Sequence, residues 1–374
     1  GGGKPLTALP AILTALNATY TRNSLKNVPQ NGALVTLSAN QFGTSYDPVA
    51  ATYGYVPEPA ATNLCTNSDG AVSTYNTADQ VTDGTAVPGF TNGIYFGNNS
   101  IQRRATKLVS MTTGTVYSVS LFIIMDDGGA PVVGSSITTG DFCIIAANNI
   151  ASPTLTRLIG SNVYRISGSS TAISTALLSG GIIKYVGQSA RTFRVTGIQV
   201  ETGLRATSYI ATTGSTASRS ADVLTVPLAN IAGFSGAGYT LAVDQRMDTT
   251  LAASTIALEI SDGTVNNRSF IYALSGTTAS VQNSSGGAGN ASIGLGSLGL
   301  TRSKYAGSYQ LNNILGAKSG VAGTADTSAV MPVSPTTLHI GASYSGSIPY
   351  NGFIFRAQLI PQALTQAQIN GLTT

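Results

Sequence analysis

The sequence predicts an all-β protein made of two tandem antiparallel β-sandwiches, with a short N-terminal attachment segment. Three observations support this fold class. Apolar segments are short, turn dipeptides separate them at close intervals, and 374 residues exceed what one core usually holds. The composition also favours a folded chain, because 42% of the residues are hydrophobic and only 9% are charged, which is the reverse of a disordered protein.

Segments of strand length are spread over the whole chain. We expect strands at 32–39, 116–125, 162–168, 181–187, 191–201, 223–226, 240–247, 254–261, 269–276, 336–343 and 353–360. Asn-Gly and Asp-Gly dipeptides, which accept the positive φ of tight turns, punctuate them. These dipeptides are Asn31-Gly32, Asp69-Gly70, Asp83-Gly84, Asn92-Gly93, Asp127-Gly128, Asp262-Gly263 and Asn351-Gly352.

The segment RTFRVTGIQVE at 191–201 illustrates how the strands are expected to pack. Period-two alternation places Phe193, Val195, Gly197, Gln199 and Glu201 on one face, with Arg194, Thr196, Ile198 and Val200 on the other. Both faces then carry apolar residues, which is typical of a strand inside a packed sandwich.

Two short segments favour helices. The first is the Ala- and Leu-rich stretch at 5–20, and the second begins at Thr365. Thr365 and Gln368 have the spacing of a capping box, and Gly371 has the position of a residue that closes the helix.

The stretch IQVETGLRATSYIATTGSTASRSADVL at 198–224 predicts a joint between two domains. A strand ends there, a run of small hydroxyl residues follows, and a new apolar segment begins at Val223. We therefore expect an attachment segment at 1–58, a first sandwich at 59–210, a linker at 211–222 and a second sandwich at 223–374. We further expect Tyr209 and Ile210 to anchor the linker on the sandwich that it leaves.

Charge and hydropathy exclude two classes of partner. The net charge of +4 is small, and Arg103-Arg104 is the only adjacent pair among scattered Lys and Arg residues, so we expect no nucleic-acid partner. The longest strongly apolar run, at 119–125, is far shorter than the roughly 20 residues that span a bilayer, so we expect no membrane insertion.

The sequence offers little for catalysis, a metal or a cofactor. The single histidine, His339, has no carboxylate near it in the sequence, and we expect an ordinary strand residue. Asp126-Asp127-Gly128-Gly129 is the densest acidic cluster and has the character of a hairpin tip. For Glu58 and Glu201 we expect structural roles as acceptors of backbone N–H groups. We predict a protein that is not an enzyme, with no metal and no cofactor.

Two cysteines, Cys65 and Cys143, are spaced too far apart for a zinc knuckle or a redox CxxC pair. Free cysteine tends to behave as a small buried hydrophobic residue. We expect two buried reduced thiols, with a disulfide between them as the alternative.

Several motifs recur in an order that resembles one family. They are ATYTRNSL at 18–25, SYDPVAATYGYVPEPAATNL at 45–64, YSVSLFI at 117–123, NVYRISG at 162–168 and VETGLRATSYIATTGSTASRSADVL at 200–224. Together they resemble bacteriophage virion proteins of the fibre or tail type, in which a carbohydrate-binding-module-like jelly roll is followed by further modules. After residue 224 the chain resembles a concanavalin A-like or laminin-G-like jelly roll, with NGFIFRAQLIPQALTQAQINGLT at 351–373 as its closing strand and helix.

This resemblance implies a fibre or spike subunit of the virion that binds a bacterial surface polysaccharide without cleaving it. It also implies contacts with other virion proteins through the N-terminal segment and assembly into a homo-oligomer, with a trimer as one arrangement. The chain has no Trp, and Val163 stands where such modules usually carry it. A purely structural capsid or tail decoration and a polysaccharide-degrading enzyme are the alternatives.

Aromatic faces surrounded by amide and hydroxyl groups are what a sugar site needs. Tyr344, Tyr350 and Asn351 lie in the segment ASYSGSIPYNG, which has the composition of a loop between two strands, where functional residues often lie. Tyr305 and Tyr309 in SKYAGSYQ share a strand face by period two. These five residues are the glycan-binding candidates that the sequence provides.

Overall fold

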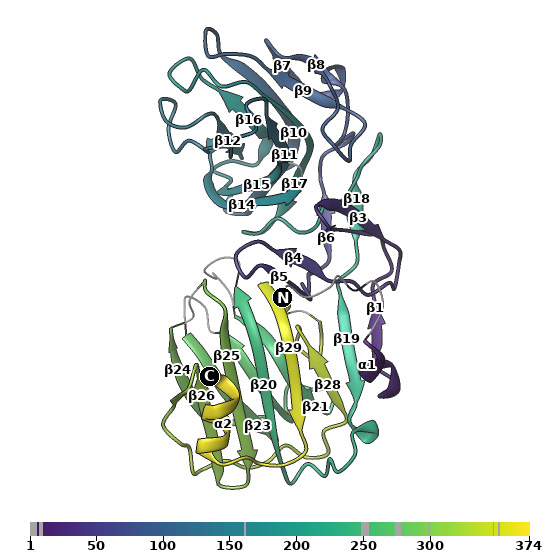
Figure 1. The fold of residues 1–374 in the computed structure, drawn as a ribbon, viewed down its shortest axis with the longest axis vertical. Coiled ribbons are helices and arrows are strands. Elements are labelled where there is room, and N and C mark those ends of the chain that lie inside the picture. The colour runs from purple at the N-terminus through teal and green to yellow at the C-terminus, as the bar shows by residue number, and fades with distance from the viewer. Residues whose placement is uncertain are drawn as a thin grey trace. The chain divides into compact units, whose positions relative to one another are not determined.

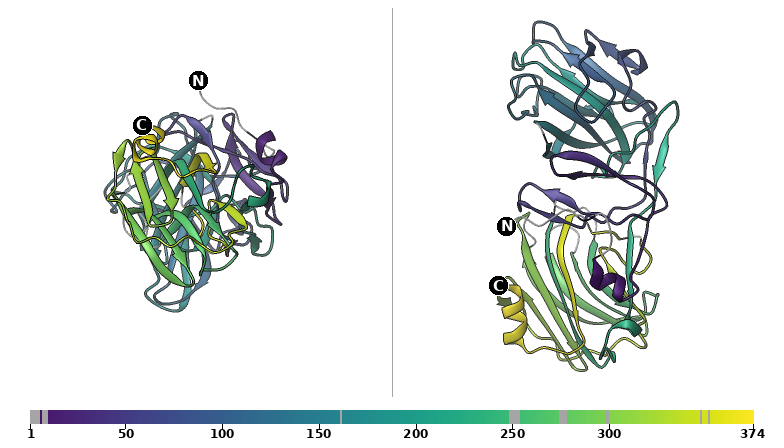
Figure 2. Two further views of the ribbon diagram at one scale, coloured as in Figure 1. Left: turned by 90° about the horizontal axis from the view of Figure 1, so that it is seen from below. Right: turned by 45° about the vertical axis from the view of Figure 1, so that its right-hand side comes forward.

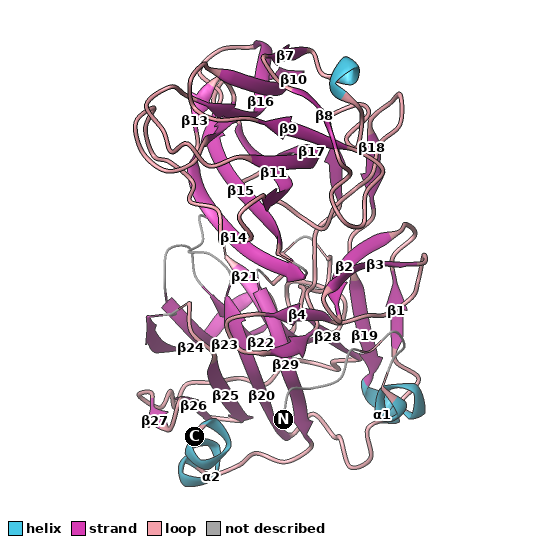
Figure 3. Ribbon diagram, turned by 45° about the horizontal axis from the view of Figure 1, so that its top comes forward, coloured by secondary structure: helices cyan, strands magenta, loops and turns pink. Residues whose placement is uncertain are grey.

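The computed structural model describes residues 6, 10–160, 162–247, 254–273, 278–297, 300–346, 348–350 and 352–374. Strands and loops make up almost all of this part of the chain, and the predicted all-β class is confirmed (Figures 1 and 3). The residues cluster into two compact units. We call Ser24–Ser38 with Ala60–Ser220 the first sandwich, and Gly1–Asn23 with Ala39–Pro59 and Ala221–Thr374 the second sandwich. The attachment segment predicted at 1–58 is thus divided between the two units.

The first sandwich packs a five-stranded sheet against a six-stranded sheet, and every strand pair in both is antiparallel. The order β13-β12-β16-β10-β7 contains β7 (Thr77–Asp79), β10 (Arg103–Met111), β12 (Cys143–Ala146), β13 (Asn149–Ile150) and β16 (Ala176–Lys184). The order β14-β15-β11-β17-β9-β8 contains β8 (Thr82–Gly84), β9 (Gly93–Phe96), β11 (Val116–Met125), β14 (Ser152–Gly160), β15 (Val163–Thr171) and β17 (Phe193–Thr202). Smaller elements are β2 (Lys26–Gln30) with β3 (Ala33–Leu37), β6 (Ala61–Asn63) with β18 (Ala217–Arg219), and the 3₁₀ turn η1 (Val72–Thr74).

The second sandwich packs a seven-stranded sheet against a five-stranded sheet, again with antiparallel pairing throughout. The order β1-β19-β28-β21-β22-β23-β24 contains β1 (Thr19–Thr21), β19 (Val223–Pro227), β21 (Thr255–Ser261), β22 (Arg268–Ala273), β23 (Thr278–Ser285), β24 (Ala288–Ser297) and β28 (Thr337–Ile340). The order β27-β26-β25-β20-β29 contains β20 (Gly238–Met247), β25 (Ser303–Gln310), β26 (Asn313–Lys318), β27 (Val321–Ala322) and β29 (Gly352–Ile360). The hairpin β4 (Ser45–Asp47) with β5 (Thr52–Gly54) and the 3₁₀ turn η2 (Leu228–Asn230) complete the unit.

The core of the first sandwich corrects the predicted faces of the segment 191–201. Phe193, Val195, Ile198 and Val200 all lie in one buried cluster, so the alternation changes phase at Gly197. The register of β11 against β17 shifts between Ser120 and Phe122, and Gly197 has a φ of +61°. A β-bulge adds one residue on one strand and therefore reverses which face the following side chains occupy. The predicted sharing of one face by Val195 and Gln199 was wrong for this reason.

The turn dipeptides behave in two ways. Asn31 and Gly32 join β2 to β3 with φ angles of +50° and +73°, as expected of a tight hairpin. Asp83-Gly84 instead lies inside β8, paired with β9. The dipeptide alone does not decide between a turn and the end of a short strand.

Two α-helices flank the second sandwich (Figures 1 and 2). The predicted capping box is confirmed in α2 (Gln366–Thr373), where the Thr365 hydroxyl accepts from the Gln368 backbone and the Gln368 side chain accepts from the Thr365 backbone. The helix continues past Gly371 to Thr373, so that glycine does not end it. In the first predicted helix, only α1 (Ala11–Ala15) is helical among the described residues. No helix in the described ranges is long and apolar enough to cross a membrane.

The joint after β17 is tied to the first sandwich. Tyr209 and Ile210 are 5% and 8% exposed, and the Tyr209 hydroxyl is 2.7 Å from the Ser68 hydroxyl, so their predicted anchoring is confirmed. The buried Glu201 carboxylate accepts from the backbone N–H and the hydroxyl of Thr207, which confirms its structural role. Farther along, β18 pairs with β6, which places part of the predicted linker in a sheet.

Two stretches before position 60, Gly1–Asn23 and Ala39–Pro59, complete the second sandwich. The rings of Tyr20, Phe42 and Tyr55 lie in its core, and Leu13 and Leu16 pack against that core. Arg246 forms a buried bidentate ion pair with Asp47, with Nε and Nη2 at 2.5 and 2.9 Å from the carboxylate oxygens. These contacts bury three aromatic rings of the predicted attachment segment within their own chain, whereas Leu25 and Val49 of the same segment are 62% and 68% exposed.

Candidate functional site

A pocket opens at one end of the second sandwich. Two loops build it: η2 with the segment that leads into β20, and the segment that precedes β28. The backbone N–H of Leu228 donates to the Thr336 carbonyl at 2.8 Å and thereby joins the two loops. The Thr336 N–H donates to Ser261 at the end of β21, so the pocket stands on the seven-stranded sheet.

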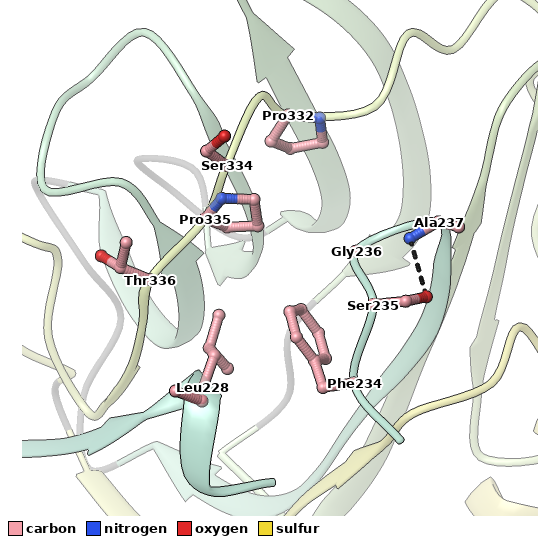
Figure 4. A pocket seen from close by; sticks show the side chains of 10 residues that line it. Leu228, Phe234, Ser235, Gly236, Ala237, Pro332, Ser334, Pro335 and Thr336 are labelled. Atoms are coloured by element: carbon pink, nitrogen blue, oxygen red, sulfur yellow. Dashed lines mark hydrogen bonds between the residues drawn. The ribbon is translucent and has the colours of Figure 1, made fainter. Parts of the chain in front are cut away.

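The walls of the pocket combine apolar side chains with hydroxyl groups. Leu228 and Phe234 project toward Pro335 and Pro332 across the opening (Figure 4). Ser235, Ser334 and Thr336 contribute hydroxyls, and Ala229, Gly236 and Ala237 complete the lining. The cavity has a volume of about 530 Å³, within the range of roughly 300–1,000 Å³ that is usual for small-molecule sites. None of the lining residues carries a charge.

The Phe234 ring packs against aromatic rings of the core. It lies 5.4 Å, between ring centroids, from Tyr239, and Tyr239 stacks on Tyr309 at 5.3 Å in the core. Both tyrosine rings are fully buried. A half-buried aromatic ring on such a support offers a flat apolar face that needs little ordering when a ligand arrives.

The five residues proposed from the sequence lie elsewhere. Tyr305 and Tyr309 do share one face of β25, but it is the inner face, where their rings are 1% and 0% exposed. Tyr350 is 2% exposed, and Asn351 lies outside the described residues. Tyr344 is half-buried, in the loop that follows β28, whereas the pocket adjoins the loop that precedes this strand. Binding of a glycan by these five residues stays a prediction.

Tyr344 belongs to a second polar cluster, on the outer face of the seven-stranded sheet. Its backbone N–H donates to the Glu259 carboxylate at 2.7 Å. Arg268 donates to the same carboxylate at 3.2 Å, and its guanidinium lies 4.4 Å from the centroid of Phe270. Burial raises the pKa of Glu259 to about 7, although these donors act in the opposite direction.

His339 lies opposite Glu259 in the register of β21 and β28. Burial lowers the pKa of His339 to about 4. The side chains of Glu259 and His339 are 0% and 8% exposed, so this pair does not face an open cleft. Within the described residues the His339 Nε2 has no hydrogen-bond partner, so the register makes Glu259 a cross-strand neighbour of His339 without a bond between them.

Three acidic residues of the first sandwich, Asp126, Asp127 and Asp141, form ion pairs with arginines. Asp127 forms an ion pair with Arg191 at 2.6 Å, and Asp126 forms one with Arg194 at 3.2 Å. The Arg191 guanidinium also contacts Asp141 at 2.6 Å. No group of three or more His, Cys, Asp or Glu side chains suited to a metal occurs within the ranges that the structure describes.

Both cysteines are free and buried in the structure. Burial raises the pKa of the Cys65 thiol to about 12, and it also raises the pKa of Cys143. The thiols are therefore protonated at neutral pH and poor nucleophiles.

The architecture defines the class of the protein as an all-β protein of two sandwiches. No protein-family model and no curated protein matches the sequence. Among solved structures, similarity is found to the CBM40 of the Ruminococcus gnavus IT-sialidase bound to α2,3-sialyllactose, at 14% identity and a TM-score of 0.32, over 37% of this chain and 83% of that one. A heptameric SAP-like pentraxin from Limulus polyphemus matches at 12% identity and a TM-score of 0.31, over 37% of this chain and 70% of that one.

Domains LG4-5 of the mouse laminin α1 chain cover more of the protein. They match at 10% identity and a TM-score of 0.27, over 75% of this chain and 94% of that one. At such identities and TM-scores, these likenesses carry no argument about what the chain binds.

Sequence reasoning missed the pocket. Phe234 and Pro335 are about 100 positions apart, and neither lies in a motif that signals binding. The available signal was the pair of Pro- and Ser-containing loops, GFSGAG at 233–238 and MPVSPTT at 331–337, each next to a predicted strand. Only the register of the sheet brings the two loops to one end of the sandwich.

Proposed function

We propose that the protein is a non-catalytic glycan-binding protein, and that the pocket between Phe234 and Pro335 holds part of a bacterial surface polysaccharide. The observation that carries this proposal is the lining, in which an aromatic face and two prolines alternate with hydroxyls and no charge is present. Sugars present C–H faces and hydroxyl rims, so they match such a lining.

The place of action that we propose is a virion, where the chain would serve as a fibre or spike subunit in adsorption to the host. The ordered motifs at 18–25, 45–64, 117–123, 162–168 and 200–224 support this assignment. Many copies on one particle make weak single sites sufficient, because avidity multiplies modest affinities. Homo-oligomeric assembly, as a trimer for example, and contacts of residues 1–58 with other virion proteins belong to the same proposal.

The test is a binding assay of the full chain on polysaccharide extracted from candidate host cells. We expect binding without release of oligosaccharides, and a loss of at least ten-fold in affinity for Phe234→Ala, which removes the aromatic face. Phe355→Ala is the matched control, because Phe355 is also a half-buried phenylalanine of the second sandwich but lies outside the pocket. Released oligosaccharides would instead establish an enzyme.

A structural role without glycan binding is the second candidate, and one surface favours it. Leu108 and Leu177 point away from the core on adjacent strands of the first sandwich and are 38% and 64% exposed, with Ile173 nearby in the chain at 75%. Exposed apolar side chains that gather in this way are common where proteins pack together. No binding to any polysaccharide, together with tight association with a virion protein, would support this role.

A further inference from the structure

The chemistry of the pocket walls restricts which sugars the pocket accepts. We infer that it selects a neutral sugar that carries a methyl group, either a 6-deoxy sugar or an N-acetylated sugar, and orients the methyl group toward Phe234 and Pro335. This inference rests on the proposed glycan binding and goes beyond it by naming the sugar class.

The first argument concerns charge. The ten lining residues include no Lys, Arg, His, Asp or Glu. A carboxylated or sulfated sugar would lose water on entry without gaining an ionic partner, which is unfavourable. Neutral sugars do not meet this penalty.

The second argument concerns hydrogen-bond donors. Pro332 and Pro335 have no backbone N–H to offer, and the N–H groups of Leu228, Phe234 and Thr336 already donate to carbonyls of the protein. The Ala237 N–H donates to the Ser235 hydroxyl at 3.4 Å, the bond drawn in Figure 4. The lining side chains that can hydrogen-bond a ligand are the hydroxyls of Ser235, Ser334 and Thr336. The Thr336 hydroxyl also lies 3.3 Å from the Thr337 hydroxyl, so part of its hydrogen-bonding capacity is already used.

A fully hydroxylated hexose is therefore a poor match. It presents polar groups around its whole rim, and those that face Phe234 and Pro335 would be desolvated without a partner. A methyl group at that place reverses the effect, because it buries apolar surface against apolar surface. The transfer free energy of one carbon corresponds to roughly four-fold tighter binding.

The third argument concerns rigidity. Phe234 cannot easily turn aside to admit a polar substituent, because Tyr239 and Tyr309 support its ring from the core. Its backbone N–H donates to Ile231 at 3.1 Å, and Ile231 donates in turn to Leu228 at 3.0 Å. The apolar wall is thus fixed in shape before a ligand binds, which favours discrimination between similar sugars.

The experiment compares matched pairs of free sugars by ligand-observed NMR on the full chain. The pairs are L-fucose with L-galactose, D-fucose with D-galactose, N-acetyl-D-glucosamine with D-glucose, and N-acetyl-D-galactosamine with D-galactose, and D-glucuronate tests charge. We expect the methyl-bearing member of at least one pair to bind four-fold or more tightly than its partner. We expect D-glucuronate to bind no better than D-glucose.

Variants connect the preference to the pocket. Phe234→Ala and, as a milder change, Phe234→Leu and Pro335→Ala should reduce the preference, whereas Phe355→Ala should leave it intact. Equal binding within every pair, a preference that survives in all three pocket variants, or a preference for glucuronate would overturn the inference. If the chain binds polysaccharide but shows none of these preferences, the sugar class is wrong and glycan binding stands. If no polysaccharide binds, the proposed function itself fails.

Discussion

Glu259 and His339 lie directly opposite each other on adjacent strands, on the outer face of the seven-stranded sheet of the second sandwich. Burial shifts their pKa values in opposite directions, to about 7 for Glu259 and about 4 for His339. Both side chains are consequently neutral through much of the interval between these two values. Burial of two neutral groups costs far less than burial of two charges, which accounts for their place under a loop.

The Glu259→Gln variant tests this arrangement through the pH dependence of stability. The folded pKa of Glu259 lies above the usual glutamate value of 4.5, so its contribution to the free energy of unfolding is present below about pH 4.5 and is lost as the pH rises through about 7. The loss amounts to about 3 kcal/mol. His339 has the opposite dependence over the same range, so the test is the difference between the two proteins rather than the native profile alone. Urea unfolding of the native chain and the variant at pH 4.5 and pH 8 should show that the stability advantage of the native chain over Glu259→Gln shrinks by about 3 kcal/mol as the pH rises. The same difference at both pH values would contradict the shifted pKa of Glu259.

His339 should have the opposite dependence. Its folded pKa lies below the usual histidine value of 6.5, so its contribution to the free energy of unfolding is complete above about pH 6.5 and is lost as the pH falls through about 4. In His339→Gln the acid-side loss of stability should be smaller, by an amount on the order of 3 kcal/mol at most. Direct titration of the single imidazole by NMR checks the cause, and a midpoint near 6.5 in the folded protein would refute the shift.

The ion pair between Asp47 and Arg246 should be important for the second sandwich. Removal of one partner of a buried pair leaves an uncompensated charge, which typically costs about 3–5 kcal/mol. We expect a loss of this size in Asp47→Ala, measured by urea unfolding. Asp127→Ala is the control, because Asp127 is 51% exposed in its pair with Arg191 and its loss should destabilise the protein much less. Comparable losses of unfolding free energy in the two variants would mean that the buried pair stabilises the protein no more than the exposed pair does.

The bulge at Gly197 predicts a difference between two glycine substitutions. A Cβ at position 197 would lie 2.7 Å from the Phe122 ring and 3.1 Å from Phe90, at a φ of +61°. At Gly214 the φ is +75°, but no atom lies within 4 Å. We expect Gly214→Ala to cost about 1 kcal/mol for backbone strain and Gly197→Ala about 1–3 kcal/mol more for the clash. Thermal unfolding of the two variants decides whether the bulge is as tightly packed as the structure indicates.

The joint after the first sandwich should resist proteases in the native protein. Tyr209 is anchored by Ser68, and β18 is paired with β6, so a protease would have to open these contacts before cleaving between 203 and 222. Tyr209→Ala should make cleavage in this interval faster, while cleavage elsewhere in the folded chain stays slow. Rapid cleavage of the unaltered protein at 203–222, mapped by mass spectrometry, would show that the segment is loose.

The sequence predicts the local part of the fold well. The segments at 116–125 and 353–360 coincide with β11 and β29 to within one residue, and the capping box at Thr365 forms as expected. These features depend on neighbours in the chain. The phase change at Gly197 could not be predicted from alternation, because a bulge depends on the partner strand.

In the candidate sites, too, local features were predicted from the sequence, whereas features that depend on distant strands were missed. Tyr305 and Tyr309 were correctly placed on one face, but alternation does not say which face meets the other sheet. The opposition of Glu259 and His339, and the approach of Phe234 to Pro335, depend on pairing between distant strands. Long-range register, which no local pattern contains, determined every functional feature that was missed.

The strand β1 pairs with β19, so residues 19–21 complete a sheet whose other members all follow residue 222. During synthesis, residues 19–21 have no strand to pair with until some 200 later residues, including β19, have emerged. A fragment cut at residue 223 would leave β19 with a bare edge and would also lose the rings of Tyr20, Phe42 and Tyr55 from its interior. Such an edge invites pairing with another molecule. The shorter fragment should therefore self-associate in solution. Keeping the segments that contain β1, Phe42 and Tyr55 in the same chain should prevent this self-association.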